Sequence, residues 1–300
     1  MFPILETEWL APAVRRMVVE APRVARRHRP GHFVIIRVRE NGERIPLTIA
    51  DSDAAAGTIT LVVQVVGATT ELLCDLRAEG GILDVVGPLG KPTEIESFGH
   101  VVLVGGGVGT AVILPQAGAL KRAGNRVTAV IGGRSQPYVI LEDRLRAVCD
   151  EVHPCTDDGS YGFHGFVTAK LQELIESSEP AVGAVLTAGP VPMMANVAKV
   201  TRPHGIKTIA SLNPIMVDGT GMCGGCRVQV GGKMRFACVD GPEFDAHEVN
   251  FAELTDRLTA YREQEQRSRQ RLHDSKERRA IHEEEAQGAC AATPEGGACR

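Results

Sequence analysis

The segment His100–Asn125 reads HVVLVGGGVGTAVILPQAGALKRAGN: a β-branched run, a glycine loop and a stretch with helical spacing. Glycines at such a turn let a pyrophosphate approach the backbone N–H groups of the helix N-terminus. Position 110 is not glycine, so the match to G-x-G-x-x-G is incomplete and a bare structural turn is the alternative. The candidate nucleotide-binding residues here are Gly105, Gly106, Gly107, Val108, Gly109 and Thr110.

The same rhythm continues to about residue 212. RVTAVIGG, EVHPC and AVLTAGP read as strands, and YVILEDRLRAVC, GFVTAKLQELI and VPMMANVAKVTRPHG read as helices. This alternation predicts a doubly wound parallel sheet over 99–212. Ligands of such sheets collect at the carboxyl ends of the strands, and two strand ends carry further candidates: Asp157, Asp158 and Gly159, and Ala188, Gly189 and Pro190. Arg134-Ser135 does not decide between NAD and NADP.

Residues 1–98 are different, because FVIIRVRE, TITLVVQVV and ILDVVG are β-branched runs separated by Gly, Pro and Asp. Several short strands before any clear helix predict a small antiparallel barrel. A helix is expected from Glu71, with Thr69 and Thr70 as caps. Its N-terminus offers N–H groups to a diphosphate, although a capped helix without a ligand is at least as common.

The segment 213–245 contains a cysteine loop. Cys223 and Cys226 are two residues apart, Cys238 follows after eleven more, and Asp218 stands five positions before Cys223. This is the layout of a plant-type [2Fe–2S] loop with its first cysteine replaced by aspartate. The glycines around these residues allow the backbone to fold closely around a cluster and to aim N–H groups at its sulfurs.

Two other interpretations of the loop remain open. A CxxC pair with two further ligands also describes a structural zinc site, and buried thiols need no metal at all. For Asp218, a turn or a helix cap is a further alternative, because a carboxylate at this position is typical of both.

Residues 246–287 are highly charged, and their first apolar residues, Phe251, Leu254 and Leu258, are spaced as on one face of a helix. We therefore expect a long C-terminal helix that is either solvated or docked on a partner. The tail 288–300 is expected to be flexible, with Cys290 and Cys299 as free thiols.

Composition excludes several classes of function. The net charge of -4 gives no indication of nucleic-acid binding, and 43% hydrophobic residues suffice for two or three domain cores. No run approaches the ~20 apolar residues of a membrane span, and the N-terminus does not resemble a signal peptide. Isolated cysteines favour a reducing compartment, so we expect a cytoplasmic protein.

With barrel, nucleotide domain and cysteine loop in that order, the chain resembles the ferredoxin–NADP reductase superfamily. More narrowly, it resembles the electron-transfer subunits of type B dihydroorotate dehydrogenase and the small subunits of NADH-dependent ferredoxin:NADP oxidoreductases. The resemblance covers about residues 1–245 and rests on ERIPLTIAD, TDDGSYG, AGP-x-x-MM and D-x4-C-x2-C-x11-C.

This resemblance implies site residues. The barrel residues would bind FAD: Arg44 (one place earlier than usual), Pro46, Leu47, Thr48, Val63, Gln64, Gly67, Thr69 and Thr70. The glycine loop, Asp157–Gly159 and Ala188–Pro190 with Met193 would bind NAD(H). The [2Fe–2S] ligands would be Asp218, Cys223, Cys226 and Cys238.

The implied activity is electron transfer, without an acid or base catalyst in the protein. Nicotinamide exchanges two electrons as hydride, whereas a [2Fe–2S] cluster takes one, so a flavin between them is needed. The resemblance implies a larger flavoprotein partner with [4Fe–4S] clusters and a second FAD, reaching ferredoxin indirectly. The alternatives are an electron-transfer subunit of NAD-linked dihydroorotate dehydrogenase and a zinc-bearing nucleotide sensor without redox chemistry.

Overall fold

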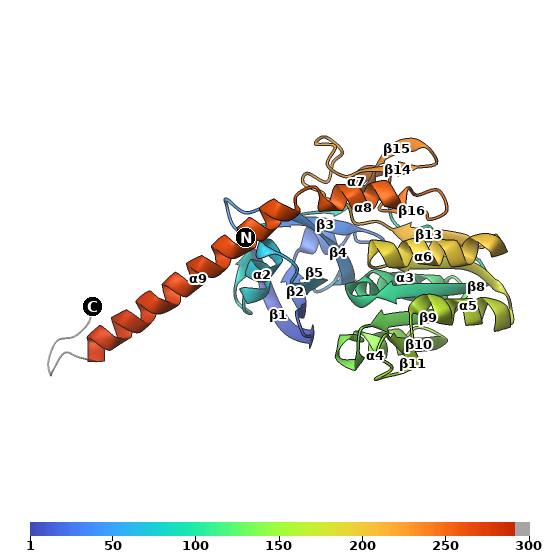
Figure 1. Ribbon diagram of the computed structural model, residues 1–300, viewed down its shortest axis with the longest axis horizontal. Helices are drawn as coiled ribbons and strands as arrows, with labels where there is room; N and C mark the ends of the chain where they lie inside the picture. The colour runs from blue at the N-terminus through green and yellow to red at the C-terminus, as the bar shows by residue number, and fades with distance from the viewer. Residues whose placement is uncertain (292–300) are drawn as a thin grey trace.

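Two seven-stranded sheets, a small hairpin segment and a long C-terminal helix make up the chain (Figure 1). The computed structural model describes residues 1–291, with side chains described through residue 278. Within this range, no helix combines the length and the hydropathy that crossing a bilayer requires.

The N-terminal sheet is antiparallel throughout, in the order β6-β1-β2-β5-β4-β3-β7. The edge strands β6 and β7 are one residue apart in the sequence, which brings the two edges together and nearly closes the sheet. The predicted antiparallel barrel is therefore confirmed. Its strands are β1 (Phe2–Ala11), β2 (Val14–Glu20), β3 (Phe33–Arg37), β4 (Arg44–Asp53), β5 (Thr58–Gln64), β6 (Gly81–Ile82) and β7 (Asp84–Leu89), with the helices α1 (Pro22–Ala25) and α2 (Ala68–Asp75).

The barrel core follows from the period of two in its strands. On β5, Ile59, Leu61 and Val63 are fully buried, whereas the threonines between and before them are partly exposed. Leu73 of α2 joins the same core, so the helix covers the barrel interior.

The second sheet has the order β11-β10-β9-β8-β12-β13-β16, and every pair is parallel except β13 with β16. The chain begins at the central strand β8, moves outward to β9 and β10, and then crosses to β12 on the other side of β8. The strands are β8 (His100–Gly106), β9 (Arg126–Gly133), β10 (Glu151–Thr156), β11 (Phe163–His164), β12 (Val182–Ala188), β13 (Lys207–Ser211) and β16 (Glu243–Asp245).

Helices cover both faces of this sheet (Figure 1). Alternate residues of β8 face opposite sides: Val101 and Leu103 pack with α3, while Val102 and Val104 pack with α5 and α6. The predicted doubly wound sheet is thus confirmed. The helical elements are η1 (Gly107–Gly109), α3 (Thr110–Arg122), η2 (Gln136–Tyr138), α4 (Glu142–Arg146), α5 (Val167–Ser177), α6 (Val191–Thr201) and η3 (Arg202–His204).

The cysteine-bearing segment forms a separate layer at one end of this sheet (Figure 1). It contains the hairpin β14 (Arg227–Val230) and β15 (Lys233–Phe236) and the short helix α7 (Ala237–Asp240). The chain then adds β16 to the α/β sheet, so this segment is built into the nucleotide domain rather than linked to it flexibly.

The single helix expected over 246–287 is divided in two: α8 (Phe251–Thr259) and α9 (Arg262–Ala291). Asn250 caps α8 by accepting a hydrogen bond from the N–H of Glu253. The apolar face of α8 packs through buried Leu254 on the cysteine-bearing segment, whereas α9 runs along α2 and then away from the body (Figure 1). Cys290 lies in α9, but its side chain and all of Cys299 are outside the described part of the structure.

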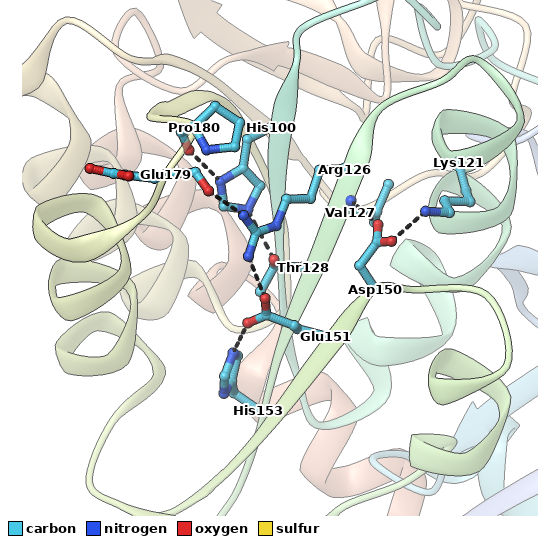
Figure 2. Close-up of polar contacts among 10 residues, drawn as sticks. All are labelled: His100, Lys121, Arg126, Val127, Thr128, Asp150, Glu151, His153, Glu179 and Pro180. Atoms are coloured by element: carbon cyan, nitrogen blue, oxygen red, sulfur yellow. Dashed lines mark hydrogen bonds and ion pairs between the residues drawn. The ribbon is translucent and has the colours of Figure 1, made fainter.

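A polar network joins the amino ends of β8, β9 and β10, opposite the glycine loop (Figure 2). His100 is 1% exposed; its Nδ1 lies 3.1 Å from the carbonyl oxygen of Pro180 and its Nε2 lies 2.9 Å from the hydroxyl of Thr128. Since a carbonyl only accepts, Nδ1 carries the proton and Nε2 accepts from Thr128. Arg126 and Glu151 extend this structural network.

His100 gives a prediction about stability and pH. Burial lowers the pKa of His100 from 6.5, although the Pro180 carbonyl opposes this shift. Below pH 6.5 the unfolded chain therefore binds a proton at His100 that the folded chain does not, so stability falls as pH falls from 6.5 toward the lowered pKa. Urea unfolding of wild type at pH 7.5 and 5.5 should show a larger loss than the same comparison for His100→Gln. Equal losses in both proteins would contradict this assignment.

Candidate functional site

The glycine loop lies where the strand order reverses. The adjacent strands β8 and β12 pair Gly105 with Ala188. Strand β9, which follows β8 in the chain, lies on one side of β8, and β12, which comes after β11, lies on the other. Open α/β sheets bind their ligands at this switch point, outside the carboxyl ends of the strands. The structure therefore brings two of the three predicted nucleotide-binding stretches together here.

Contacts across the switch point leave no room for side chains. A Cβ at Gly109 would lie 2.1 Å from the carbonyl oxygen of Ala188, and one at Gly106 would lie 2.4 Å from the sulfur of Met193. Gly189 has φ +153°, and a Cβ there would lie 2.8 Å from the methyl carbon of Met193 and 3.1 Å from the backbone of Gly106. In contrast, a Cβ at Gly107 would meet no atom within 4 Å, so the outer side of the loop is open. A ligand can approach the backbone from that side.

The glycine loop also contacts the barrel. Val108 packs with the barrel residues Ala11 and Val62, and Thr110 is buried at the start of α3. Pro190 precedes α6, which carries Met193.

The third stretch, Asp157–Gly159, follows β10, two strands away from β8. The carboxylate of Asp158 accepts hydrogen bonds from the N–H and the hydroxyl of Ser160, at 2.9 and 2.6 Å, and these bonds lower its pKa. The backbone N–H of Asp157 donates to Gly133. This stretch lies at the same sheet edge as the glycine loop. The Asp158 carboxylate is used within its own turn, and the N–H groups of Asp157 and Asp158 are used on Gly133 and Arg134 at the end of β9.

The predicted flavin residues lie on neighbouring barrel elements. Arg44, Pro46, Leu47 and Thr48 belong to β4, Val63 and Gln64 end the adjacent strand β5, and Gly67 caps α2. Strand β4 also contacts α3, so this face of the barrel borders the nucleotide domain.

The threonines of α2 have specific partners. The helix begins at Ala68, three residues before the expected start, and the hydroxyl of Thr70 accepts from the N–H groups of Val66 and Gly67, both at 3.0 Å. Thr70, at the third helical position, therefore makes the side-chain capping bonds, while Gly67 occupies the N-cap position. The hydroxyl of Thr69 instead donates to the carboxylate of Glu43 at 2.7 Å. Glu43 is thus an anionic group at the N-terminus of α2, where a diphosphate is predicted.

The four predicted metal ligands form two pairs. The sulfurs of Cys226 and Cys238 are 3.2 Å apart and buried, while the carboxylate of Asp218 accepts from the N–H of Cys223 at 2.9 Å. The side chain of Cys223 is exposed. Among the described residues, no three His, Cys, Asp or Glu side chains are close enough to hold one metal ion.

The electrostatics of the two pairs differ. Partial burial opposes ionisation of Asp218, but hydrogen bonds from Thr220 and Cys223 outweigh it and lower its pKa to about 2. Burial, reinforced by the neighbouring Cys226, raises the pKa of Cys238 to about 12. A thiol in such surroundings ionises only when a cationic centre replaces its proton.

The segment fits an iron–sulfur cluster. Its donors are those of such a cluster, three thiols and a carboxylate within the glycine-rich residues 218–238, although they lie here as two pairs. Two backbone N–H groups point at sulfur: Gly225 toward Cys223 at 3.4 Å and Cys238 toward Cys226 at 3.5 Å. Such N–H contacts tune cluster sulfurs. The loop also needs glycine where it crosses the barrel, because a Cβ at Gly219 would lie 2.5 Å from Leu89.

A flavin-type barrel, a nucleotide-type sheet and an iron–sulfur loop define an electron-transfer protein with the ferredoxin-reductase-like fold. Phthalate dioxygenase reductase shares this fold at 17% identity and a TM-score of 0.55, over 76% of this chain and 85% of that one. Residues 213–250 match the iron-sulfur cluster binding domain of dihydroorotate dehydrogenase B.

The individual relatives are more specific. A dihydroorotate dehydrogenase B (NAD(+)) electron transfer subunit homolog of Thermotoga maritima is 51% identical over 85% of this chain and 89% of that protein. A solved structure of NADH-dependent reduced ferredoxin-NADP oxidoreductase has a TM-score of 0.86 and 46% identity, covering 91% of this chain and 98% of that one. The chain belongs to the family of dihydroorotate dehydrogenase B electron-transfer subunits and their homologues, and it is an oxidoreductase subunit.

Several residues that shape the site give no signal in the sequence. Glu43, Glu243 and Gln116 are scattered polar residues, and only the folded chain shows what they contact. The contacts of α9 with α2 are also long-range: Glu71 accepts from Lys276 at 2.7 Å and lies 3.1 Å from His273. The periodicity of a local sequence segment does not predict such long-range pairs.

Two glycine variants in the same helical region test the crowding at the switch point. Gly109→Ala should lower the free energy of unfolding by about 1–3 kcal/mol, because the new methyl group meets the Ala188 carbonyl and the backbone must move. Gly118→Ala, in α3, meets only the flexible end of Arg122 and should raise it by up to ~1 kcal/mol. Denaturant unfolding measures both, and destabilisation of equal size would show that the loop is not specially constrained.

Proposed function

We propose that this chain exchanges hydride between NAD(H) and a bound FAD and passes single electrons between FAD and a [2Fe–2S] cluster. The observation that carries the proposal is the position of the cysteine-bearing segment. Its core contains Phe33 and Ile35 of the barrel, Met194 of the nucleotide domain and the Cys226–Cys238 pair. All three predicted sites therefore lie in parts that pack on one another.

The cofactors would supply the redox chemistry, with the flavin converting two-electron into one-electron transfer. The chain's own residues would bind and orient them. The open glycine loop with Ala188–Pro190 and Met193 would hold NAD(H), and Asp157–Gly159 would line the same edge. The β4 and β5 residues and the N-terminus of α2 would hold FAD, and Asp218, Cys223, Cys226 and Cys238 would hold the cluster.

Glu43 lies where the diphosphate of FAD is proposed to bind. The Glu43 carboxylate, bonded to Thr69, lies where negative charge is favoured by the N–H groups of α2. A bound diphosphate would have to displace it or be placed beside it. Flavin binding would then free the hydroxyl of Thr69 to donate to phosphate.

The partner would be a larger flavoprotein subunit with [4Fe–4S] clusters and a second FAD, reaching ferredoxin indirectly in an electron-bifurcating complex in the cytoplasm. The similarity to NADH-dependent reduced ferredoxin-NADP oxidoreductase supports this reading, since it spans 98% of that chain. Asp218 in place of the first cluster cysteine and the long α9 also favour it.

Specific observations also favour a second candidate, the electron-transfer subunit of a dihydroorotate dehydrogenase. Residues 213–250 match that enzyme's cluster-binding domain, and relatives at 32–34% identity in Shouchella clausii and Bacillus velezensis carry its name. The purified complex separates the two: NADPH-linked ferredoxin reduction supports the first, and orotate formation from dihydroorotate supports the second.

Removal of one buried thiol tests the assignment of separate cofactor sites. Cys226→Ala should abolish the iron–sulfur absorbance and the electron paramagnetic resonance signal of the NADH-reduced protein. The flavin band should remain, because Cys226 lies in the cysteine-bearing segment and the predicted flavin residues lie in the barrel. Cys149→Ala is the matched control: Cys149 is a thiol of the nucleotide domain and should leave both signals unchanged. If Cys226→Ala loses flavin and iron together in a folded protein, the sites are not separate.

The helix α9 is the candidate docking element for the partner. Its described side-chain contacts with the body are ion pairs that centre on Glu71 of α2. Three residues on one side of α9 pair with this carboxylate: Arg269, His273 and Lys276. The Glu71 side chain is 16% exposed and its partners on α9 are 39–49% exposed. Ion pairs with cations this accessible to solvent contribute little stability, so we expect the rest of the chain to fold without α9.

Truncation after Ala260 should therefore preserve folding and flavin content but release the chain from its larger partner on gel filtration. Glu71→Ala in the full chain removes the Glu71 ion pairs of α9 but keeps the helix and the Lys276–Asp75 pair, and should keep the complex. A truncated chain that still co-elutes with the partner would contradict the docking role.

A further inference from the structure

Glu243 connects three parts of the molecule. One oxygen of its carboxyl group, Oε1, accepts a hydrogen bond from the hydroxyl of Thr93 and another from the side-chain amide of Gln116, each 2.7 Å long. Thr93 lies in the segment between the barrel and the nucleotide sheet, Gln116 lies on α3, and Glu243 lies on β16, five residues after Cys238. Thr93 and Gln116 are 3% and 2% exposed.

The backbone around Glu243 is joined to the same neighbours. Gly241 accepts from the N–H of Lys91 at 2.7 Å, and Pro242 accepts from the N–H of Leu212 at 2.9 Å. Gly31 of the barrel also belongs to this junction, because a Cβ there would lie 2.7 Å from Thr93 and 3.0 Å from the Glu243 carboxyl. The cysteine-bearing segment therefore meets the barrel at the same place where it rejoins the nucleotide sheet, at β16.

This polar contact is costly to keep in the interior. Burial raises the pKa of Glu243, although the bonds from Thr93 and Gln116 oppose that shift, and the amide oxygen Oε1 of Gln116 is buried without a partner in the described structure. Apolar residues at both positions would avoid these penalties, whereas replacing only one partner would leave the other buried and unpaired. The cost indicates that the contact serves a purpose other than stability.

We propose that Glu243 is a positioning residue: through it, a nucleotide bound at the glycine loop holds the cysteine-bearing segment in place against the sheet and the barrel. The inference rests on the proposed function, because it takes the loop ligand to be the diphosphate of a nicotinamide nucleotide. Gln116 is six residues after Thr110 in α3, so about 9 Å of one continuous helix, which contains Pro115, separates the loop from the Glu243 carboxyl. A ligand that fixes the start of α3 thereby fixes Gln116, and Gln116 holds β16 through Glu243.

Hydrogen exchange of the holoprotein, with ADP-ribose as the probe, tests this coupling without relying on turnover. ADP-ribose at about 100 times its dissociation constant can suppress local opening by up to ~100-fold where it binds. In wild type it should slow exchange at residues 105–110 and also, by about threefold or more, at 207–212 and 241–245. In Glu243→Ala and in Gln116→Leu, protection should be confined to 105–110.

Two further variants distinguish positioning from a general loss of structure. Glu243→Gln keeps an oxygen that accepts from Thr93 and Gln116 and should restore the remote protection. Glu94→Ala removes an exposed carboxylate from the segment that carries Thr93 and should behave as wild type. Remote protection that persists in Glu243→Ala and Gln116→Leu, or that is absent in wild type while 105–110 is protected, would overturn the coupling alone. Absence of protection at 105–110 in wild type would overturn the nucleotide site itself, and the coupling with it.

Discussion

The burial of two thiols at the meeting point of three structural units is the constraint on which this molecule depends. Cys226 and Cys238 lie in one apolar core with barrel strand β3, helix α6 and helix α8. Their sulfurs are close enough to share a metal centre, and burial keeps Cys238 protonated without one. The segment that carries the thiols is therefore fixed relative to both the barrel and the nucleotide sheet, which is what electron transfer between bound groups needs.

A second constraint acts at the switch point of the parallel sheet. The loop from β8 and the loop from β12 touch through Gly109 and Ala188, and Met193 closes over Gly106. This crowding leaves one open side, at Gly107, and the nearby residue Val108 packs on the barrel. Since nucleotide and flavin must meet face to face for hydride transfer, an opening that borders the barrel is the arrangement that the proposed function requires.

Much of this architecture could be predicted from local patterns. The runs of β-branched residues gave the barrel strands β3 and β5, the alternation of strand and helix gave the doubly wound sheet, and glycine and cysteine spacing indicated the loops. These signals are local because each one reflects the period of a single element or a single turn. The expected helix over 246–287 was only partly right, because the chain breaks between α8 and α9 at Ala260–Tyr261, where no Gly or Pro marks the end.

What could not be predicted is long-range. The hairpin of β1 and β2 carries many charged residues and lacks a clear apolar alternation, so pairing with β5 and β6 rather than local propensity makes it a strand pair. The contact of Glu243 with Gln116 spans 127 positions, and that of Lys276 with Glu71 spans 205. Such pairs have no spacing rule, and they are the contacts that join the parts of the molecule to one another.

The most direct test of the account is the iron and acid-labile sulfide content of the chain purified anaerobically, with zinc measured in the same sample. A chain that holds a [2Fe–2S] centre should contain about two iron atoms and two sulfides, together with bound flavin. Zinc without iron, or buried thiols without any metal, would contradict the account.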